Sequence, residues 1–110
     1  MGGAWDVALD YGNGWVTHQN WLIFQNVCEL TLRGDPPDPY GAGLDATPQN
    51  GFARADFFHA SWVKTARCRD ACSIDANVSG NTFTGEILFI ESPCENFPGG
   101  FGTVTATGSR

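Results

Sequence analysis

The sequence predicts an all-β fold: a small antiparallel up-and-down β-barrel of seven to eight strands, with a β-sandwich as the alternative. Apolar and polar residues alternate along several segments at the two-residue period of a strand. The 14 glycines mark the turns between those segments, and the aromatic residues, 13% of the chain, fall within them. Because 110 residues leave room for one domain, we expect residues 1–110 to form a single barrel.

The first two strands are predicted on either side of a glycine-rich turn. Residues 5–11 alternate in polarity, and their apolar face consists of Trp5, Val7, Leu9 and Tyr11. The turn Gly12-Asn13-Gly14 tolerates the positive φ that hairpins require. Residues 15–24 form the returning strand, and either of its faces can point inward. One face holds Trp15, Thr17, Gln19, Trp21 and Ile23, and the other holds Val16, His18, Asn20, Leu22 and Phe24.

A third strand and a long loop follow. After a turn at 25–27, residues 28–33 form a strand with Cys28, Leu30 and Leu32 on one face. Residues 34–51 hold four of the six prolines and little apolar periodicity, which predicts a long loop that is either a lid or disordered. Tyr40 and Leu44 are its large apolar residues, so any packing of this loop over a barrel mouth would come from them.

The strand count depends on residues 52–65, which form one long strand or two shorter ones. Their aromatic and β-branched content favours strand over helix. Residues 68–72 are expected to turn, and residues 92–100 to form a loop rich in Pro and Gly. Three further strands are expected, at 73–78, 82–91 and 101–107. The count is seven strands if 52–65 is continuous and eight if it is broken.

The charge balance argues against a nucleic-acid partner. Twelve acidic and six basic residues give a net charge of −6, a field that repels a phosphate backbone. No apolar run approaches the roughly 20 residues that span a bilayer, so no membrane span is expected. The first residues lack the charged and apolar regions of a signal peptide. Four cysteines and a single lysine favour an exported, periplasmic or secreted protein over a cytoplasmic one.

Both ends of the chain resemble the lipocalin-like (calycin) β-barrels. Gly3-Ala4-Trp5 at the first strand is similar to the Gly-x-Trp of that family, and Arg110 follows the last strand, as does the family arginine that packs on this tryptophan. The stretches 78–85 and 102–110 look like the closing hairpin of short bacterial members. The resemblance implies a barrel that binds a small apolar or amphipathic molecule, with Arg110 packed on Trp5.

A second resemblance, to the bacterial metalloprotease inhibitors, rests on chain length, the early tryptophan Trp5 and the cysteines. These inhibitors are also calycin-like barrels, so the resemblance implies a protein-binding function. Their N-terminal segment does the inhibiting, and residues 1–4 are short for that role.

The four cysteines, Cys28, Cys68, Cys72 and Cys94, permit three disulfide pairings. We expect Cys68 to pair with Cys72 across the Arg-Asp-Ala turn and Cys28 to pair with Cys94, with free thiols as the alternative. A tetrathiolate zinc site needs two close pairs, and only Cys68 and Cys72 are near in sequence, so no metal is expected. No phosphate loop or nucleotide fingerprint occurs, so no cofactor is expected.

Aromatic and polar residues on the predicted strands form the candidate ligand site. If the barrel is hollow, its cavity is lined by aromatic side chains, namely Tyr11, Trp15, Trp21, Phe57, Phe58 and Trp62. Polar contacts to a ligand would come from His18, Gln19, Arg54 and His59. His18 and His59 are also a candidate acid/base or metal pair, because strand side chains converge inside a barrel. The alternative is that the aromatics are packed core and the histidines are structural.

The sequence thus predicts a non-catalytic binding module for a small apolar or amphipathic ligand. The alternative is a protein-binding module, such as an enzyme inhibitor, that uses the loops 34–51 or 92–100, or a homo-oligomer. A third hypothesis is a small barrel isomerase or cyclase that uses His18 or His59. A cavity above about 300 Å³ would favour ligand binding, whereas a filled barrel would favour a surface function.

Overall fold

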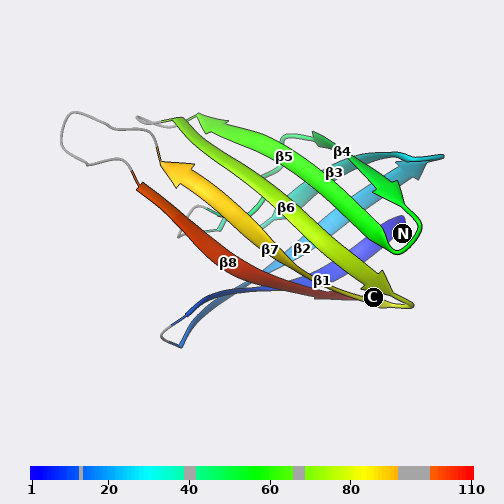
Figure 1. Cartoon of the computed structure of the whole chain (residues 1–110), viewed down its shortest axis with the longest axis horizontal. Helices are drawn as coiled ribbons and strands as arrows, with labels where there is room; N and C mark the ends of the chain where they lie inside the picture. Colours follow the sequence, from blue (N-terminus) through cyan, green and yellow to red (C-terminus); the bar gives the residue numbers. More distant parts are fainter. Residues whose placement is uncertain (13, 39–41, 66–68, 92–99) are drawn as a thin grey trace.

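The chain forms a closed antiparallel barrel in which each strand pairs with its sequence neighbours and the last strand pairs with the first (Figure 1). This computed structural model describes residues 1–12, 14–38, 42–65, 69–91 and 100–110. Within these residues there are eight strands and no helix: β1 (Gly3–Gly12), β2 (Trp15–Asn26), β3 (Glu29–Asp35), β4 (Gln49–Arg54), β5 (Phe57–Thr65), β6 (Arg69–Ser79), β7 (Thr82–Glu91) and β8 (Gly100–Ser109). The predicted up-and-down barrel is therefore confirmed, and the sandwich alternative is excluded.

The segment 52–65 is broken into two strands, which settles the count at eight over the described residues. β4 ends at Arg54 and β5 begins at Phe57, so Ala55 and Asp56 form a tight turn. Ala55 has a φ of 52° there, a conformation that L residues other than Asn and Asp seldom adopt. Alanine is not a residue that favours such turns, so the local sequence does not predict where the segment breaks.

Other strand ends differ from the prediction. β2 extends to Asn26, and the next turn consists of Val27, with a φ of 58°, and Cys28. β3 continues to Asp35 and β4 starts at Gln49, so the segment between strands is 36–48 rather than 34–51. The expected turn at 68–72 is wrong from residue 69 onward, because β6 starts at Arg69.

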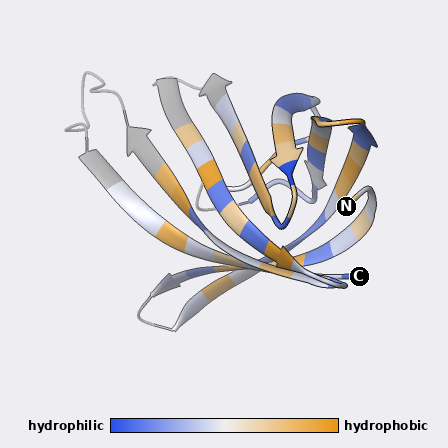
Figure 2. Ribbon diagram, turned by 45° about the vertical axis from the view of Figure 1, so that its right-hand side comes forward, coloured by the Kyte–Doolittle hydropathy of each residue, from blue (hydrophilic) through white to orange (hydrophobic). Residues whose placement is uncertain are grey.

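Alternate residues of each strand point into the barrel, and their side chains fill its centre. Figure 2 shows the resulting alternation of polar and apolar bands along the strands. The ring of Phe83 lies 5.2 Å from Trp5, 5.8 Å from Trp21 and 5.1 Å from Phe58, measured between ring centroids. All of these rings are buried. The ambiguity of β2 is also resolved, because Gln19, Trp21 and Ile23 face inward.

One end of the barrel is covered by residues 36–38 and 42–48, which we call the strap. Tyr40, also expected to pack at this end, lies outside the described residues. The side chain of Leu44 is fully buried, as expected for a residue that packs into the barrel mouth. The Gln19 side-chain amide donates to the carbonyls of Pro36 and Leu44, both at 2.7 Å. Its oxygen accepts from the Leu44 N–H at 3.1 Å and from the Trp21 indole at 2.9 Å. The Gln19 side chain therefore holds the strap through the main-chain atoms of Pro36 and Leu44.

A second anchor of the strap is the buried carboxylate of Asp38. It accepts a hydrogen bond from the Tyr11 hydroxyl and from the N–H groups of Ala42 and Gly43, at 3.2 and 3.1 Å. Burial, and next the hydrogen bond to Asp38, raise the pKa of Tyr11 above its usual range. The Tyr11 hydroxyl thus stays protonated and acts as a donor.

Substituting Gly108 by alanine tests the packing around Phe83. A Cβ at residue 108 would overlap the Phe83 ring, which is enclosed by Trp5, Trp21 and Phe58 and cannot move aside. We expect Gly108→Ala to lower the free energy of unfolding by about 1–3 kcal/mol in urea titrations. Gly2→Ala is the control, because its Cβ would meet nothing nearer than 3.4 Å. Equal midpoints for the two variants would contradict this packing.

Replacing Gln19 by leucine tests the attachment of the strap. Gln19→Leu keeps most of the side-chain volume but leaves the Trp21 indole N–H and strap main-chain groups without partners. At about 1–3 kcal/mol for each buried group, we expect a loss of about 2–4 kcal/mol in unfolding free energy. Asn20→Leu, on the same strand but exposed, should stay within about 0.5 kcal/mol of wild type. A loss no larger than that of the control would rule out the anchoring role.

Candidate functional site

The candidate site is a pocket of about 300 Å³ at the end of the barrel opposite the strap. We call this end the terminal end, because β1 begins there and β8 ends there (Figure 1). The turns that follow β2, β4 and β6 also lie at this end. The apolar part of the lining comes from Met1, Val27, Ala53, Ala55, Phe57 and Val78. Polar groups come from Gln25, Cys28, Arg54, Asp56 and Arg110.

Main-chain hydrogen bonds tie the turns around the pocket to the strands beside them. The Val78 N–H donates to the Asp56 carbonyl at 2.6 Å, and the Ala53 N–H donates to the Cys28 carbonyl at 2.8 Å. The turn at Ala55 and Asp56 is thereby fixed to β6, and β4 is fixed to the turn before β3. The walls of the pocket are consequently held by backbone geometry.

The rim next to the pocket is fixed by the contact that the calycin resemblance implies. The Arg110 guanidinium lies over the Trp5 ring, 4.5 Å from its centroid, and donates to the Gly2 carbonyl at 2.7 Å. The Trp5 indole N–H donates to the Met1 carbonyl at 2.9 Å. The expected packing of Arg110 on Trp5 is confirmed. Together with the two hydrogen bonds, it ties the end of the chain to its first residues.

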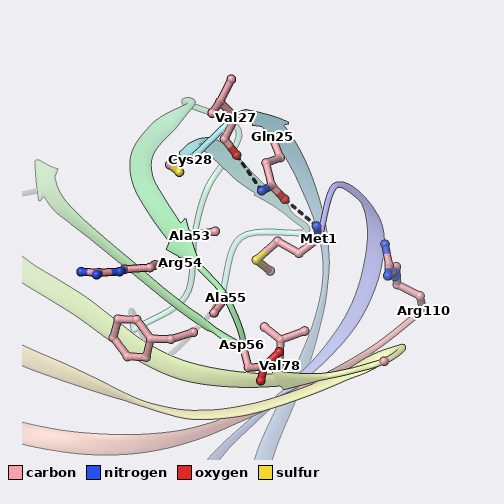
Figure 3. A pocket seen from close by; sticks show the side chains of 12 residues that line it. Met1, Gln25, Val27, Cys28, Ala53, Arg54, Ala55, Asp56, Val78 and Arg110 are labelled. Atoms are coloured by element: carbon pink, nitrogen blue, oxygen red, sulfur yellow. Dashed lines mark hydrogen bonds between the residues drawn. The ribbon is translucent and has the colours of Figure 1, made fainter.

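Figure 3 shows how the side chains lie around the pocket. The Met1 side chain projects into the space between Ala53 and Val78, while the guanidinium groups of Arg54 and Arg110 extend outward along opposite sides of the rim. This arrangement places apolar side chains and charged groups side by side in the lining, which suits a small molecule with one apolar part and one polar part. No histidine is among the described residues that line the pocket.

The predicted ligand residues are divided among several places and do not form one cavity. Arg54 and Phe57 line the terminal pocket. Trp21 and Phe58 are packed in the core, as the alternative interpretation of the aromatics held, and Trp62 and Tyr11 also face inward. The remaining predicted side chains lie on the outside of the barrel, namely Trp15, His18 and His59.

The two histidines do not face each other. His18 is exposed on the outer face of β2, beside Ala8 of β1. On the outer face of β5, His59 Nδ1 lies 2.7 Å from Asp75 Oδ1, where solvent weakens the interaction. The residues that the structure describes contain no group of three or more metal-ligating side chains placed to hold an ion. The barrel therefore does not assemble the acid/base or metal pair that we considered.

The expected disulfide between Cys28 and Cys94 is not formed, because Cys28 carries a free thiol. The pairing of Cys68 with Cys72 stays a prediction, because Cys68, like Cys94, lies outside the described residues. Cys28 is exposed with a free thiol in the turn after β2, where it lines the pocket. Cys72 is buried on β6, facing into the barrel opposite Trp62.

Most of the pocket was missed by sequence reasoning because its residues come from five separate segments of the chain. Met1, Ala53 and Val78 are small or ordinary apolar residues without any motif. They meet only because the register of a closed barrel brings the ends of distant strands together. The signal that did point to this end of the molecule was Gly-x-Trp with the late arginine.

We compared the chain with known protein families, curated proteins and solved structures. No protein-family model, curated protein or solved structure matches this chain. Among the described residues, no helix has the length and apolar character needed to cross a bilayer. The structure therefore establishes the fold, a closed antiparallel barrel with the Arg110–Trp5 contact at its terminal end.

Proposed function

We propose that the protein is a non-catalytic binding module that holds a small amphipathic molecule in the terminal pocket. The observation that carries this proposal is the pocket itself, about 300 Å³ and lined by both apolar side chains and charged or polar groups. Ligand sites in proteins typically have volumes of about 300–1,000 Å³, so the occupant is small. A chain of about eight carbons or one aromatic ring with a single polar group is the size class that we expect.

The packed centre of the barrel supports this location over the interior site expected from the calycin resemblance. Phe83, Trp5, Trp21 and Phe58 occupy the space that a hollow barrel would leave to a ligand. A ligand seated on the aromatic cluster would have to displace side chains packed in contact with one another. The terminal pocket needs no such rearrangement, since its walls are fixed by main-chain hydrogen bonds.

The residues around the pocket favour binding over catalysis. Cys28 supplies a thiol, but among the described residues no hydrogen bond joins this thiol to the Asp56 carboxylate or to another base. Asp56 and the arginines Arg54 and Arg110 can orient a polar group by charge and hydrogen bonding. The pocket therefore provides recognition without a nucleophile and base arranged for chemistry.

A ligand panel tests the proposal by thermal unfolding. We expect at least one of octanoate, octan-1-ol and phenylacetate to raise the unfolding midpoint by about 5–10 °C at tenfold excess over its Kd, since binding to the folded state stabilises it by mass action. Ala53→Leu should abolish this shift, because the larger side chain fills the pocket.

The matched control is Ala46→Leu, which adds the same atoms at an exposed position in the strap. It should keep the ligand-induced shift. The midpoints of both unliganded variants are measured first, so that loss of fold is separated from loss of binding. A panel that leaves the wild-type midpoint unchanged, or shifts Ala53→Leu as much as wild type, would refute the proposal.

A second candidate function, protein binding, is favoured by aromatic side chains on the outer surface. Phe24 and Phe52 are 59% and 46% exposed, and the Phe52 ring lies 6.4 Å from Phe57 and 5.4 Å from His59. Phe24 lies on the outer side of β2, separated from Phe52 by strand β3. We call these four residues of β2, β4 and β5 the aromatic face. Exposed apolar groups gathered on one face typically mark an interaction site. A second copy of the chain is the partner to examine first.

Sedimentation across a protein concentration series tests this second function. We expect wild type to self-associate, and the double variant Phe24→Ser/Phe52→Ser to remain monomeric, because two large apolar side chains leave the contact. Val16→Ser is the control, since Val16 is 46% exposed on β2 away from the aromatic face and should leave association intact. A monomeric wild type, or equal association of the double variant, would exclude self-association through this face.

A further inference from the structure

Trp62 differs from the other buried tryptophans in having no hydrogen-bond acceptor for its indole N–H. It is 4% exposed on β5 and faces into the barrel. Trp5 donates to the Met1 carbonyl and Trp21 donates to Gln19, at 2.9 Å in both cases. For Trp62 Nε1, no partner is present among the described residues. Buried polar groups without partners are rare in native proteins, and each calls for a physical explanation.

The surroundings of Trp62 place it near the strap end of the barrel. It pairs in register with Cys72 of β6, which is also buried and faces inward. At the same end of the barrel, the Tyr11 hydroxyl donates to Asp38 of the strap. On β5, Trp62 comes two residues after Ala60, which pairs with Gly51 of β4. The same register places Trp62 opposite Gln49, the residue at which β4 begins after the strap.

A second polar group at this end also lacks a partner. Thr17 lies in the inward row of β2, two residues before Gln19, and its hydroxyl is buried without a hydrogen bond within the described chain. An unpaired donor buried in the folded protein is destabilising, because it has given up its hydrogen bond to water. Each of these two groups would therefore be stabilised by gaining a hydrogen-bond partner.

We infer that the strap end of the barrel holds a second, interior binding position for a small uncharged molecule with a hydrogen-bond acceptor, which receives the Trp62 N–H. The charge of the occupant follows from its surroundings. The buried Asp38 carboxylate and the net charge of −6 disfavour an anion there, and an N–H donor disfavours a cation. A ketone, ether or tertiary amide oxygen fits these conditions. This site is at the opposite end of the barrel from the terminal pocket and does not depend on it.

An isosteric substitution tests whether the Trp62 donor is unpaired in the free protein. Benzothienylalanine replaces the indole N–H by sulfur at nearly constant volume, so it removes the donor without leaving a cavity. At position 62 we expect the unfolding midpoint of the unliganded protein to stay the same or rise. At position 21 it should fall, since a bond to Gln19 is lost. A fall at position 62 equal to that at position 21 would show that a bound water already pairs the donor, and would overturn the inference.

Titration with a neutral acceptor tests binding directly in the full chain. The indole ¹H–¹⁵N signals are assigned by Trp→Phe variants, and cyclohexanone is the probe. We expect a saturable downfield shift of the Trp62 signal, with the Trp5 and Trp21 signals unchanged, and no shift on titration with cyclohexane or cyclohexanecarboxylate.

The same titration is then repeated with the position-62 isostere, where all saturable cyclohexanone binding should disappear. Absence of a saturable Trp62 shift with cyclohexanone, or an equal shift with cyclohexane, would overturn the inference. An equal shift with cyclohexanecarboxylate would overturn its restriction to uncharged ligands. None of these outcomes bears on the terminal pocket, which Ala53→Leu reports separately.

Discussion

The fold depends on the packing of one phenylalanine ring at the centre of the barrel. Phe83 of β7 contacts Trp5 of β1, Trp21 of β2 and Phe58 of β5, and so it joins strands from opposite walls. An antiparallel sheet closed by main-chain hydrogen bonds has no free edge, but it needs its interior filled to be stable. In so short a chain, large aromatic rings supply that filling with few residues. Space for a ligand is consequently left at the ends of the barrel.

The alternation of polarity was enough to predict the class of fold and most of its strands. The predicted strand 82–91 coincides with β7, and the apolar face of Trp5, Val7 and Leu9 faces inward as expected. These features depend on local periodicity, which a single sequence displays directly. The contact of Arg110 with Trp5 was also foreseen, although by a family resemblance and not by pattern.

Features that depend on long-range geometry were not predictable in the same way. The break between β4 and β5 depends on the positive φ of Ala55, and an alanine in the sequence does not predict a positive φ. The attachment of Leu44 to Gln19 joins residues 25 positions apart, and neither side chain signals the other. Likewise, His18 and His59 both fall on strands as predicted, but the direction in which each side chain points depends on a register that only the closed barrel fixes.

The carboxamide of Gln19 has the same donor and acceptor groups as a peptide bond, and it uses them on the strap as a neighbouring strand would. It contacts the carbonyls of Pro36 and Leu44 and the N–H of Leu44, all of them main-chain atoms. The Gln19 side chain thus makes hydrogen bonds of the kind that join strands, although the strap is not a strand. Because the recognition is of backbone, most side chains of the strap are free to change during evolution without loosening it. The exceptions are Asp38, whose carboxylate accepts hydrogen bonds, the buried Leu44, and Gly43, whose added Cβ would overlap Gln19 Oε1.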